Sequence, residues 1–308
     1  MRIVYFDCSA RTAALAEREP AFFEGIEIHA SDPKDEADTI ARLAGADVAI
    51  NGHSYMPAPV LEALAPTLKR IVFLGTGAAT YVDMEAAARL GISVEVCRDY
   101  GSRTIAEFAF GMLLDSARQI SKMDRGMRAG TWPVLGGPEL KGKTLGVVGL
   151  GGIGKEMARI GADFGMNVLA WNRSPPKEEL PVEMVSLETL FEQSLAVSLH
   201  VATTPETIGM IGADLLDRMP KGAILVNVAR GELVDQDALC AALTNGPLGH
   251  AALDVFPMEP LPSDDPIRDF DNVTLTAHAA WNTPDAGRRL LEIGVGLARM
   301  SFGKDTHQ

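Results

Sequence analysis

Cysteine is scarce in this chain, which has three among its 308 residues: Cys8, Cys97 and Cys240. They lie far apart and form no C-x-x-C pair, so the sequence favours neither a disulfide framework nor a cysteine-based zinc site. We interpret the three cysteines as small buried hydrophobic residues. We therefore expect no metal in the functional site.

Positive charge is also in short supply, because 28 Lys and Arg residues face 41 Asp and Glu residues, for a formal net charge of -13. This balance opposes nonspecific binding to nucleic acid or to an anionic membrane surface. No apolar run reaches transmembrane length, and the N-terminal "MRIVYFDCS" reads as a strand rather than a signal peptide. We expect a cytoplasmic protein without nucleic-acid or membrane partners, in which an anionic ligand must meet a local cation.

The first part of the chain alternates short apolar runs with helical stretches. The runs "RIVYF", "DVAIN", "KRIVFLG" and "ISVEV" are rich in β-branched residues, and helices are predicted near residues 11–18 and 83–91, where Gly91 ends the second. This alternation is typical of a parallel sheet covered by helices. It predicts the α/β fold class with a doubly wound sheet.

A second series of the same kind follows a long amphipathic helix, predicted over residues 104–128, and a Gly- and Pro-containing segment over 130–144. Its strands are "TLGVVGLG", "NVLAW", "LAVSLHV", "AILVNV", "HAALDV" and "VTLTAH". We predict a final helix over 285–302 that packs back on the first domain. The expected organisation is a first domain of residues 1–98 plus 281–308 and a second of residues 99–280.

A glycine-rich loop opens the second domain. Gly149, Gly151 and Gly154 form G-x-G-x-x-G between a strand and a helix, which is the context that a dinucleotide-binding loop requires. The amides of Gly152 and Ile153 would open the helix, where its dipole favours an anion. A plain strand-to-helix turn and a methyltransferase-like nucleotide site are the alternatives.

The next strand ends in "WNRSP" rather than in the acid that usually binds a ribose hydroxyl. An acid there would repel a 2′-phosphate, whereas Arg173 and Ser174, beside Asn172, are able to bind one. The sequence therefore favours NADP(H) over NAD(H). A solvated arginine in a turn is the alternative interpretation.

Polar residues stand at the ends of three later strands of the second domain. Arg230 follows "ILVNV", Asp254 and Glu259 follow "AAL", and His278 follows "VTLTA". Ligands of open α/β sheets bind at these carboxyl ends. Each residue alone also fits a surface cation, a solvated acid or a satisfied histidine, but together beside a glycine loop they predict one site.

With these motifs the chain resembles the D-isomer-specific 2-hydroxyacid dehydrogenases over nearly its whole length. The resemblance rests on "KRIVFLGTGAATYVDMEAAARLGI", "IAEFAFGMLLDSARQI", "ELKGKTLGVVGLGGIG", "HVATTPETIGMIG", "MPKGAILVNVARGELVDQDAL", "LDVFPMEPLP" and "TAHAAWNT". It implies a Rossmann cofactor domain (99–280) and a flavodoxin-like substrate domain with a cleft between them. It also implies hydride transfer between a nicotinamide and a 2-keto or 2-hydroxy acid, and a homodimer formed through the cofactor domain, with residues 127–138 as its arm.

The resemblance assigns roles to individual residues. His278 looks like the general acid that protonates the keto oxygen, Glu259 like its carboxylate partner, and Arg230 like the cation that holds the substrate carboxylate. Asp254 looks like the residue that binds the nicotinamide carboxamide. The remaining assignments are backbone amides at Thr76 and Gly77 for the carboxylate, and Thr207 and Thr104 near the cofactor.

The motif "HAAWNT" departs from the family pattern after the histidine and places Trp281 toward the substrate, as in glyoxylate and hydroxypyruvate reductases. In the first domain, "NGHSYMP" offers Tyr55 and Met56 as pocket residues, with simple packing as the alternative, and contains no basic cluster for a phosphorylated substrate. We also expect no regulatory C-terminal domain of the kind found in many phosphoglycerate dehydrogenases. Two rival functions remain: a dinucleotide-sensing corepressor, and a formate- or phosphite-type dehydrogenase.

Overall fold

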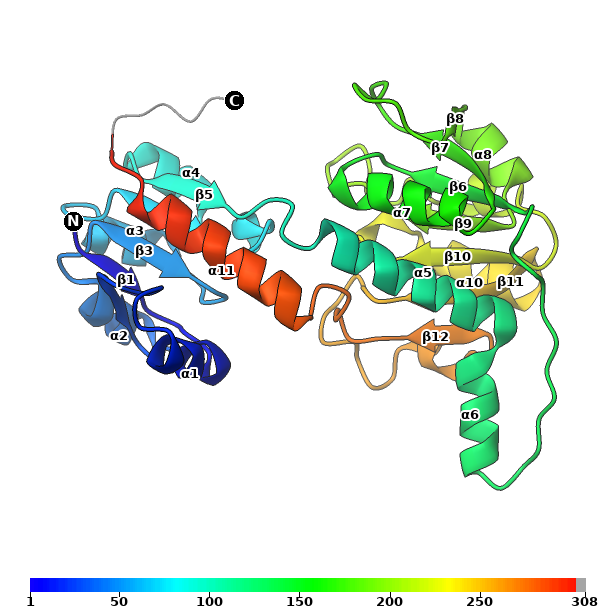
Figure 1. The fold of residues 1–308 in the computed structure, drawn as a ribbon, viewed down its shortest axis with the longest axis horizontal. Coiled ribbons are helices and arrows are strands. Elements are labelled where there is room, and N and C mark those ends of the chain that lie inside the picture. The colour runs from blue at the N-terminus through cyan, green and yellow to red at the C-terminus, as the bar shows by residue number, and fades with distance from the viewer. Residues whose placement is uncertain (303–308) are drawn as a thin grey trace. The chain divides into compact units, whose positions relative to one another are not determined.

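The computed structural model describes residues 1–302, which form two compact units (Figure 1). The first comprises Met1–Tyr100 together with the described residues from Thr283 onward, and the second comprises Gly101–Asn282. The chain passes between them after residues 100 and 282, two residues later than the predicted boundaries. Among the helices of residues 1–302, none is long and apolar enough to cross a membrane.

The first unit contains a parallel sheet with strand order β2-β1-β3-β4-β5. This is the order of flavodoxin-like sheets, and it matches the predicted fold of this part of the chain. Its strands are β1 (Ile3–Tyr5), β2 (Ile26–Ile28), β3 (Val48–Asn51), β4 (Arg70–Phe73) and β5 (Ser93–Val96). Its helices are α1 (Ala10–Arg18), α2 (Glu36–Leu43), α3 (Ala58–Leu64), the 3-10 helix η1 (Ala78–Thr80), α4 (Met84–Arg89) and α11 (Pro284–Arg299).

Helices cover both faces of this sheet, because its strands are apolar on both sides. One core forms under α2, α3 and α4, and a second under α1 and α11. Helix α11 packs against β3 and β4, and Arg70 of β4 donates to the last carbonyls of α11, those of Leu297 and Met300. The final helix thus returns to the sheet that the N-terminal part of the chain builds.

The second unit contains a parallel sheet with strand order β12-β11-β10-β9-β6-β7-β8. Counted from β6, six of these strands follow the order 3-2-1-4-5-6, which is that of a Rossmann fold. Its strands are β6 (Thr144–Val148), β7 (Asn167–Trp171), β8 (Glu183–Met184), β9 (Ala196–Leu199), β10 (Ala223–Asn227), β11 (Leu248–Leu253) and β12 (Val273–Leu275). Its helices are α5 (Ser102–Arg118), α6 (Ile120–Arg128), α7 (Gly152–Asp163), α8 (Leu187–Gln193), α9 (Ala213–Leu216), η2 (Gly231–Leu233), α10 (Gln236–Thr244) and η3 (Pro266–Asp269).

The two faces of this sheet also carry separate cores. Helices α5 and α7 pack together over one face, and α8, α9 and α10 cover the other. The direction of the winding reverses between β6 and β9, so the carboxyl end of β6 lies at the switch point where open α/β sheets bind ligands. Both sheets therefore confirm the predicted doubly wound α/β fold.

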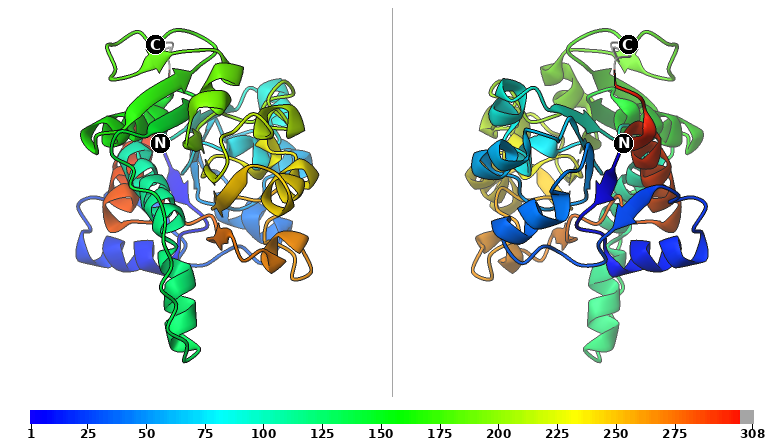
Figure 2. Two further views of the ribbon diagram at one scale, coloured as in Figure 1. Left: turned by 90° about the vertical axis from the view of Figure 1, so that its right-hand side faces the viewer. Right: turned by 90° about the vertical axis from the view of Figure 1, so that its left-hand side faces the viewer.

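The prediction of one helix over residues 104–128 is wrong. Gln119 adopts a left-handed conformation (φ 54°) that ends α5 and starts α6. Its side-chain amide donates to the carbonyl of Gly136 (2.8 Å), and the carboxylate of Asp115 accepts from the amide of Ser121 (2.6 Å). Helix α6 consequently runs out from the rest of its unit, with no buried residue of its own (Figure 2).

Candidate active site

The glycine loop after β6 is shaped by two close backbone approaches. Gly149 has a φ of 99°, and a Cβ there would lie 2.6 Å from the carbonyl oxygen of His200. A Cβ on Gly154 would lie 1.8 Å from the carbonyl oxygen of Gly149. These two positions require glycine for the packing of the protein itself.

Gly151 differs from both, because a Cβ built on it meets no atom within 4 Å. It is the N-cap of α7, which begins at Gly152 as the glycine pattern predicts. Unpaired amides and the positive end of the helix dipole meet at this open position. The loop therefore has the room and the polarity that a dinucleotide pyrophosphate requires.

The turn after β7 is tied directly to the glycine loop. The side chain of Asn172 accepts from the amide of Leu150 (3.0 Å) and donates to the carbonyl of Ser174 (2.6 Å). Arg173 and Ser174 themselves are exposed, and within residues 1–302 Arg173 has no hydrogen-bond or ion-pair partner. Asn172 thus holds the turn, and Arg173 presents a free guanidinium beside the loop.

Two threonines assigned to the cofactor are placed differently from each other. The hydroxyl of Thr207 donates to the carbonyl of Ala202 (2.8 Å) and accepts from the amide of Thr204 (2.7 Å), so it closes the turn after β9. Thr104 is buried in the first turn of α5. Their contact with a cofactor remains a prediction.

The structure brings His278 and Glu259 together. His278 follows β12 with a left-handed backbone (φ 49°), and its Nδ1 lies 2.7 Å from Oε2 of Glu259. The other carboxylate oxygen, Oε1, accepts from the amide of Phe256 (3.0 Å), which fixes the carboxylate plane. Since Nδ1 faces the carboxylate, Nε2 is the nitrogen left to meet a substrate. About 41% of the histidine side chain is exposed, so solvent reaches it.

Asp254 is fully buried beneath this histidine. Its carboxylate accepts from the amides of Ala279 (2.9 Å) and Ala280 (3.0 Å) and from the hydroxyl of Thr276 (2.6 Å). Its carbonyl accepts from the amide of His278 (2.8 Å). The structure therefore gives Asp254 a task that the resemblance did not imply, which is to hold the loop that carries the histidine.

Arg230 lies on the turn after β10. Its backbone is extended (φ -151°, ψ 142°), its side chain is half-buried, and its Nη1 donates to the carbonyl of Ala229 (2.6 Å). The next residue, Gly231, is pressed against the turn that contains Phe256, because a Cβ on it would lie 2.0 Å from the Phe256 carbonyl carbon. The turns that carry Arg230 and Glu259 are thus packed together without an intervening side chain.

The predicted residues of the first unit lie after β3 and β4. Thr76 is exposed and Gly77 half-buried, directly before η1. Tyr55 is 62% exposed, but Met56 is fully buried in the core under α2, α3 and α4. The prediction of Met56 as a pocket residue is wrong, since its side chain packs inside the first unit. In the second unit, Trp281 is 39% exposed shortly after His278.

Sequence reasoning missed a loop support in the first unit. The buried carboxylate of Asp7 accepts from three successive amides, those of Gly52, His53 and Ser54, at 2.8 Å each. Asn51 adds two hydrogen bonds to Ser54. The available sequence signal was a polar residue after a buried apolar run. The hydrogen bonds from Asp7 and Asn51 show that the loop leading to Tyr55 is preorganised.

His200, at the end of β9, is a second residue that sequence reasoning missed. Burial lowers its pKa to about 3, its Nε2 lies 2.8 Å from the hydroxyl of Ser198, and its buried Nδ1 has no partner within residues 1–302. The histidine is therefore neutral, and its backbone carbonyl packs against Gly149 of the glycine loop. Among the described residues, no group of three or more His, Cys, Asp or Glu side chains is arranged to hold a metal ion.

A dinucleotide loop at the switch point of a Rossmann sheet, with an arginine and a histidine–glutamate pair at later strand ends, defines a nicotinamide-dependent oxidoreductase. The model of the D-isomer specific 2-hydroxyacid dehydrogenase NAD binding domain matches residues 110–280. A glyoxylate reductase of Korarchaeum cryptofilum is 42% identical over 245 residues, which cover 77% of this chain and 73% of that protein. The chain belongs to the D-isomer specific 2-hydroxyacid dehydrogenase family, as the resemblance predicted.

Solved structures agree with this assignment. A D-lactate dehydrogenase from Lactobacillus jensenii with NAD+ aligns with a TM-score of 0.82 at 27% identity, covering 97% of this chain and 96% of that one. An acyclic imino acid reductase in complex with NADPH and D-Arg aligns with a TM-score of 0.83 at 27% identity, covering 95% and 94%. The protein is thus a hydroxyacid dehydrogenase or reductase, and its second unit is an NAD(P)-binding domain.

Proposed function

We propose that this enzyme reduces a small 2-keto acid of the glyoxylate or hydroxypyruvate kind, with NADPH preferred over NADH, as a cytoplasmic homodimer. The observation that carries the cofactor preference is the turn of Asn172, Arg173 and Ser174. It offers an exposed, unpaired guanidinium where a carboxylate would bind a ribose hydroxyl. The amide of Asn172 is already engaged with Leu150 and Ser174, so it does not replace that carboxylate.

The charges around Arg173 support the same choice. Glu206 senses the charge of Arg173: the pKa of Glu206 is held below its usual value by the Thr204 hydroxyl, by its own backbone and, more weakly, by the charge of Arg173. Arg173 forms no ion pair with Glu206, so its donors are available to a phosphate. In a protein of net charge -13, this local cation is what a 2′-phosphate needs.

The chemistry follows from the three side chains at the strand ends. A bound nicotinamide supplies the hydride. His278, held by Glu259 through Nδ1, donates a proton from Nε2 to the oxygen on which negative charge develops, and such acid catalysis contributes roughly 10²–10⁴-fold. Arg230 binds the substrate carboxylate through the planar, two-pronged geometry of its guanidinium.

Three features support a small, unphosphorylated substrate. The Korarchaeum relative is named a glyoxylate reductase. The loop of Tyr55 contains no arginine or lysine that would meet a phosphate, and the bulky Trp281 stands near His278 along the chain. The amides at Thr76 and Gly77, the side chain of Tyr55 and that of Trp281 are our proposed substrate-binding groups.

A panel assay tests this function directly. The purified protein is mixed with NADPH or NADH and with glyoxylate, hydroxypyruvate, pyruvate or phenylpyruvate, and oxidation of the cofactor is followed. We expect the highest kcat/KM with NADPH and either glyoxylate or hydroxypyruvate. Dinucleotide binding without turnover would favour a sensing protein, and oxidation of formate or phosphite in the reverse assay would overturn the proposed substrate class.

A homodimer is supported by the apolar surface around α6. The side chains of Met127 (48%), Trp132 (80%) and Val134 (84%) are strongly exposed on α6 and the segment after it. Apolar residues that gather on an exposed arm mark association surfaces. We propose that this arm binds the cofactor-binding unit of a second copy.

A further inference from the structure

The side chain of Asn227 closes the turn that carries Arg230. Asn227 is the last residue of β10 and is 1% exposed. Its Oδ1 accepts from the amide of Ala229 (3.0 Å), and its Nδ2 donates to the carbonyl of Arg230 (2.8 Å). One carboxamide thus pairs a donor and an acceptor of the turn at the same time, through two separate atoms.

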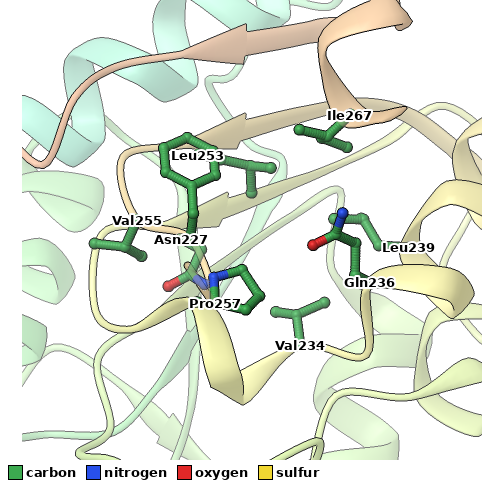
Figure 3. Close-up of a pocket in the computed structure, with 10 residues that line it drawn as sticks. Asn227, Val234, Gln236, Leu239, Leu253, Val255, Pro257 and Ile267 are labelled. Atoms are coloured by element: carbon green, nitrogen blue, oxygen red, sulfur yellow. The ribbon is translucent and has the colours of Figure 1, made fainter. Parts of the chain in front are cut away.

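The surroundings of this amide are mostly apolar. Asn227 lines a small cavity of about 20 Å³ together with Val255, Pro257 and Ile267, and Figure 3 shows its carboxamide among these side chains. In such surroundings a hydrogen bond is stronger than in water, and an unpaired polar group is costly. The amide is therefore bound firmly to its turn.

The same residue links the turn to the rest of the catalytic group. The carbonyl of Asn227 accepts from the amide of Asp254 (2.9 Å), and Asp254 in turn holds the loop of His278. On the other side, Gly231 packs against the backbone of Phe256, whose amide binds Glu259. The backbone of Arg230 is consequently fixed between β10 and the neighbouring turn, with the carboxamide of Asn227 as its side-chain support.

We infer that Asn227 is a positioning residue that acts through Arg230: it sets the backbone from which the guanidinium reaches the substrate carboxylate. The inference rests on the proposed keto-acid reduction. A displacement of a binding group by about 1 Å is able to cost on the order of 100-fold in rate. The hydrogen bonds of the carboxamide go to Ala229 and Arg230 and not to the glycine loop, so we expect the dinucleotide affinity to stay close to its parent value.

Two substitutions separate the two hydrogen bonds. Asn227→Asp keeps the shape and the acceptor for Ala229, but sets an oxygen against the carbonyl of Arg230. Asn227→Ser keeps a small acceptor near Ala229 and loses the reach to Arg230. We expect both variants to raise the KM for the keto acid by about tenfold or more, while the NADPH dissociation constant measured without substrate stays within about twofold of the parent value.

The matched control is Asn272→Asp, which makes the same amide-to-acid change in the second unit. Asn272 directly precedes β12 and belongs to no catalytic turn. Its side chain donates to the carbonyl of Leu243 in α10 (3.3 Å). We expect parent KM and kcat for this variant. Thermal unfolding of all variants shows whether each is folded, and Asn227→Ser carries the test if Asn227→Asp does not fold.

A double-mutant cycle with Arg230→Ala distinguishes positioning from general stabilisation. If Asn227 acts through Arg230, adding Asn227→Ser to Arg230→Ala changes kcat/KM by less than about twofold, because the group being positioned is already gone. Additive losses, or parent kinetics in Asn227→Ser alone, would overturn the inference. A parent protein without keto-acid reductase activity would instead refute the proposed function, so the two failures are distinct.

Discussion

The substitution Gly151→Ala tests whether Gly151 is required for binding a ligand, in contrast to Gly149 and Gly154, which the packing of the protein requires. A Cβ on Gly151 meets no atom within 4 Å, and its backbone is extended (φ -68°, ψ -173°), which alanine adopts without strain. Such a replacement stabilises a protein by about 0.4–1 kcal/mol, because the unfolded chain loses freedom. The unliganded variant should therefore melt at or slightly above the parent temperature.

Dinucleotide binding should respond in the opposite direction. The added methyl group occupies the space through which a pyrophosphate approaches the amides at the start of α7. A hydrogen bond to a charged group contributes about 1.5–3 kcal/mol, so loss of one contact lowers affinity by about ten- to a hundredfold. NADH and NADPH should be affected equally, since both carry the pyrophosphate.

Gly154→Ala is the contrasting variant. Its Cβ would lie 1.8 Å from the carbonyl oxygen of Gly149, far inside ordinary contact, so α7 must shift. Overpacking of this kind costs about 1–3 kcal/mol of stability. Fluorescence titration of both cofactors and thermal melts of the unliganded proteins make the comparison. If Gly151→Ala binds NADH and NADPH as the parent does, the open position is not where the pyrophosphate lies.

Four further predictions follow from the site and its surroundings. Arg173→Ala should weaken NADPH by about ten- to a hundredfold and leave NADH nearly unchanged; equal losses in titrations of both cofactors would show that Arg173 is only a solvated turn residue. His278→Ala should lower kcat by about 10²–10⁴-fold with cofactor binding intact, and near-normal turnover would exclude it as the proton donor. Burial lowers the pKa of His250 to about 4, so its contribution to stability is present above the unfolded-state pKa near 6.5 and is lost as pH falls toward 4. Between pH 7 and 5 the free energy of unfolding should fall by about 2 kcal/mol for this reason. In urea unfolding, His250→Gln should lose less stability than the parent over this pH range, by about that amount. Trp132→Ser should shift the protein toward monomer in light scattering, whereas an unchanged parent dimer would place the interface elsewhere.

The parts of the site that sequence predicts are those fixed by local patterns. The glycine loop needs only a strand, three glycines and a helix in one contiguous segment, here residues 144–163, and α7 begins where these predict. Arg230, Glu259 and His278 were found because each follows an apolar run that ends at the carboxyl edge of the sheet. Backbone periodicity and turn chemistry therefore carry this information in contiguous sequence.

What sequence does not predict depends on partners far along the chain. Gln119 is a good helix former, and its left-handed break is fixed by the distant carbonyl of Gly136. The carboxylate of Asp254 reaches amides 25 and 26 residues away. Met56 was misassigned because its position after a turn does not reveal that it faces the core. The strands β2 and β8 have three and two residues, which is too short for an alternating pattern to be recognised.

The backbone of the loop after β3 is held by buried side chains and not by the exposed side chains of the loop itself. Asp7 and Asn51 hold its backbone from inside the first unit, while His53 and Tyr55 point to solvent and are 50% and 62% exposed. The exposed pair of His53 with Asp32 (2.8 Å) adds little stability. The fold therefore places little constraint on positions 53 and 55. A library randomised at these two sites should yield folded enzymes with altered keto-acid preference, whereas one randomised at positions 7 and 51 should yield mostly unfolded protein.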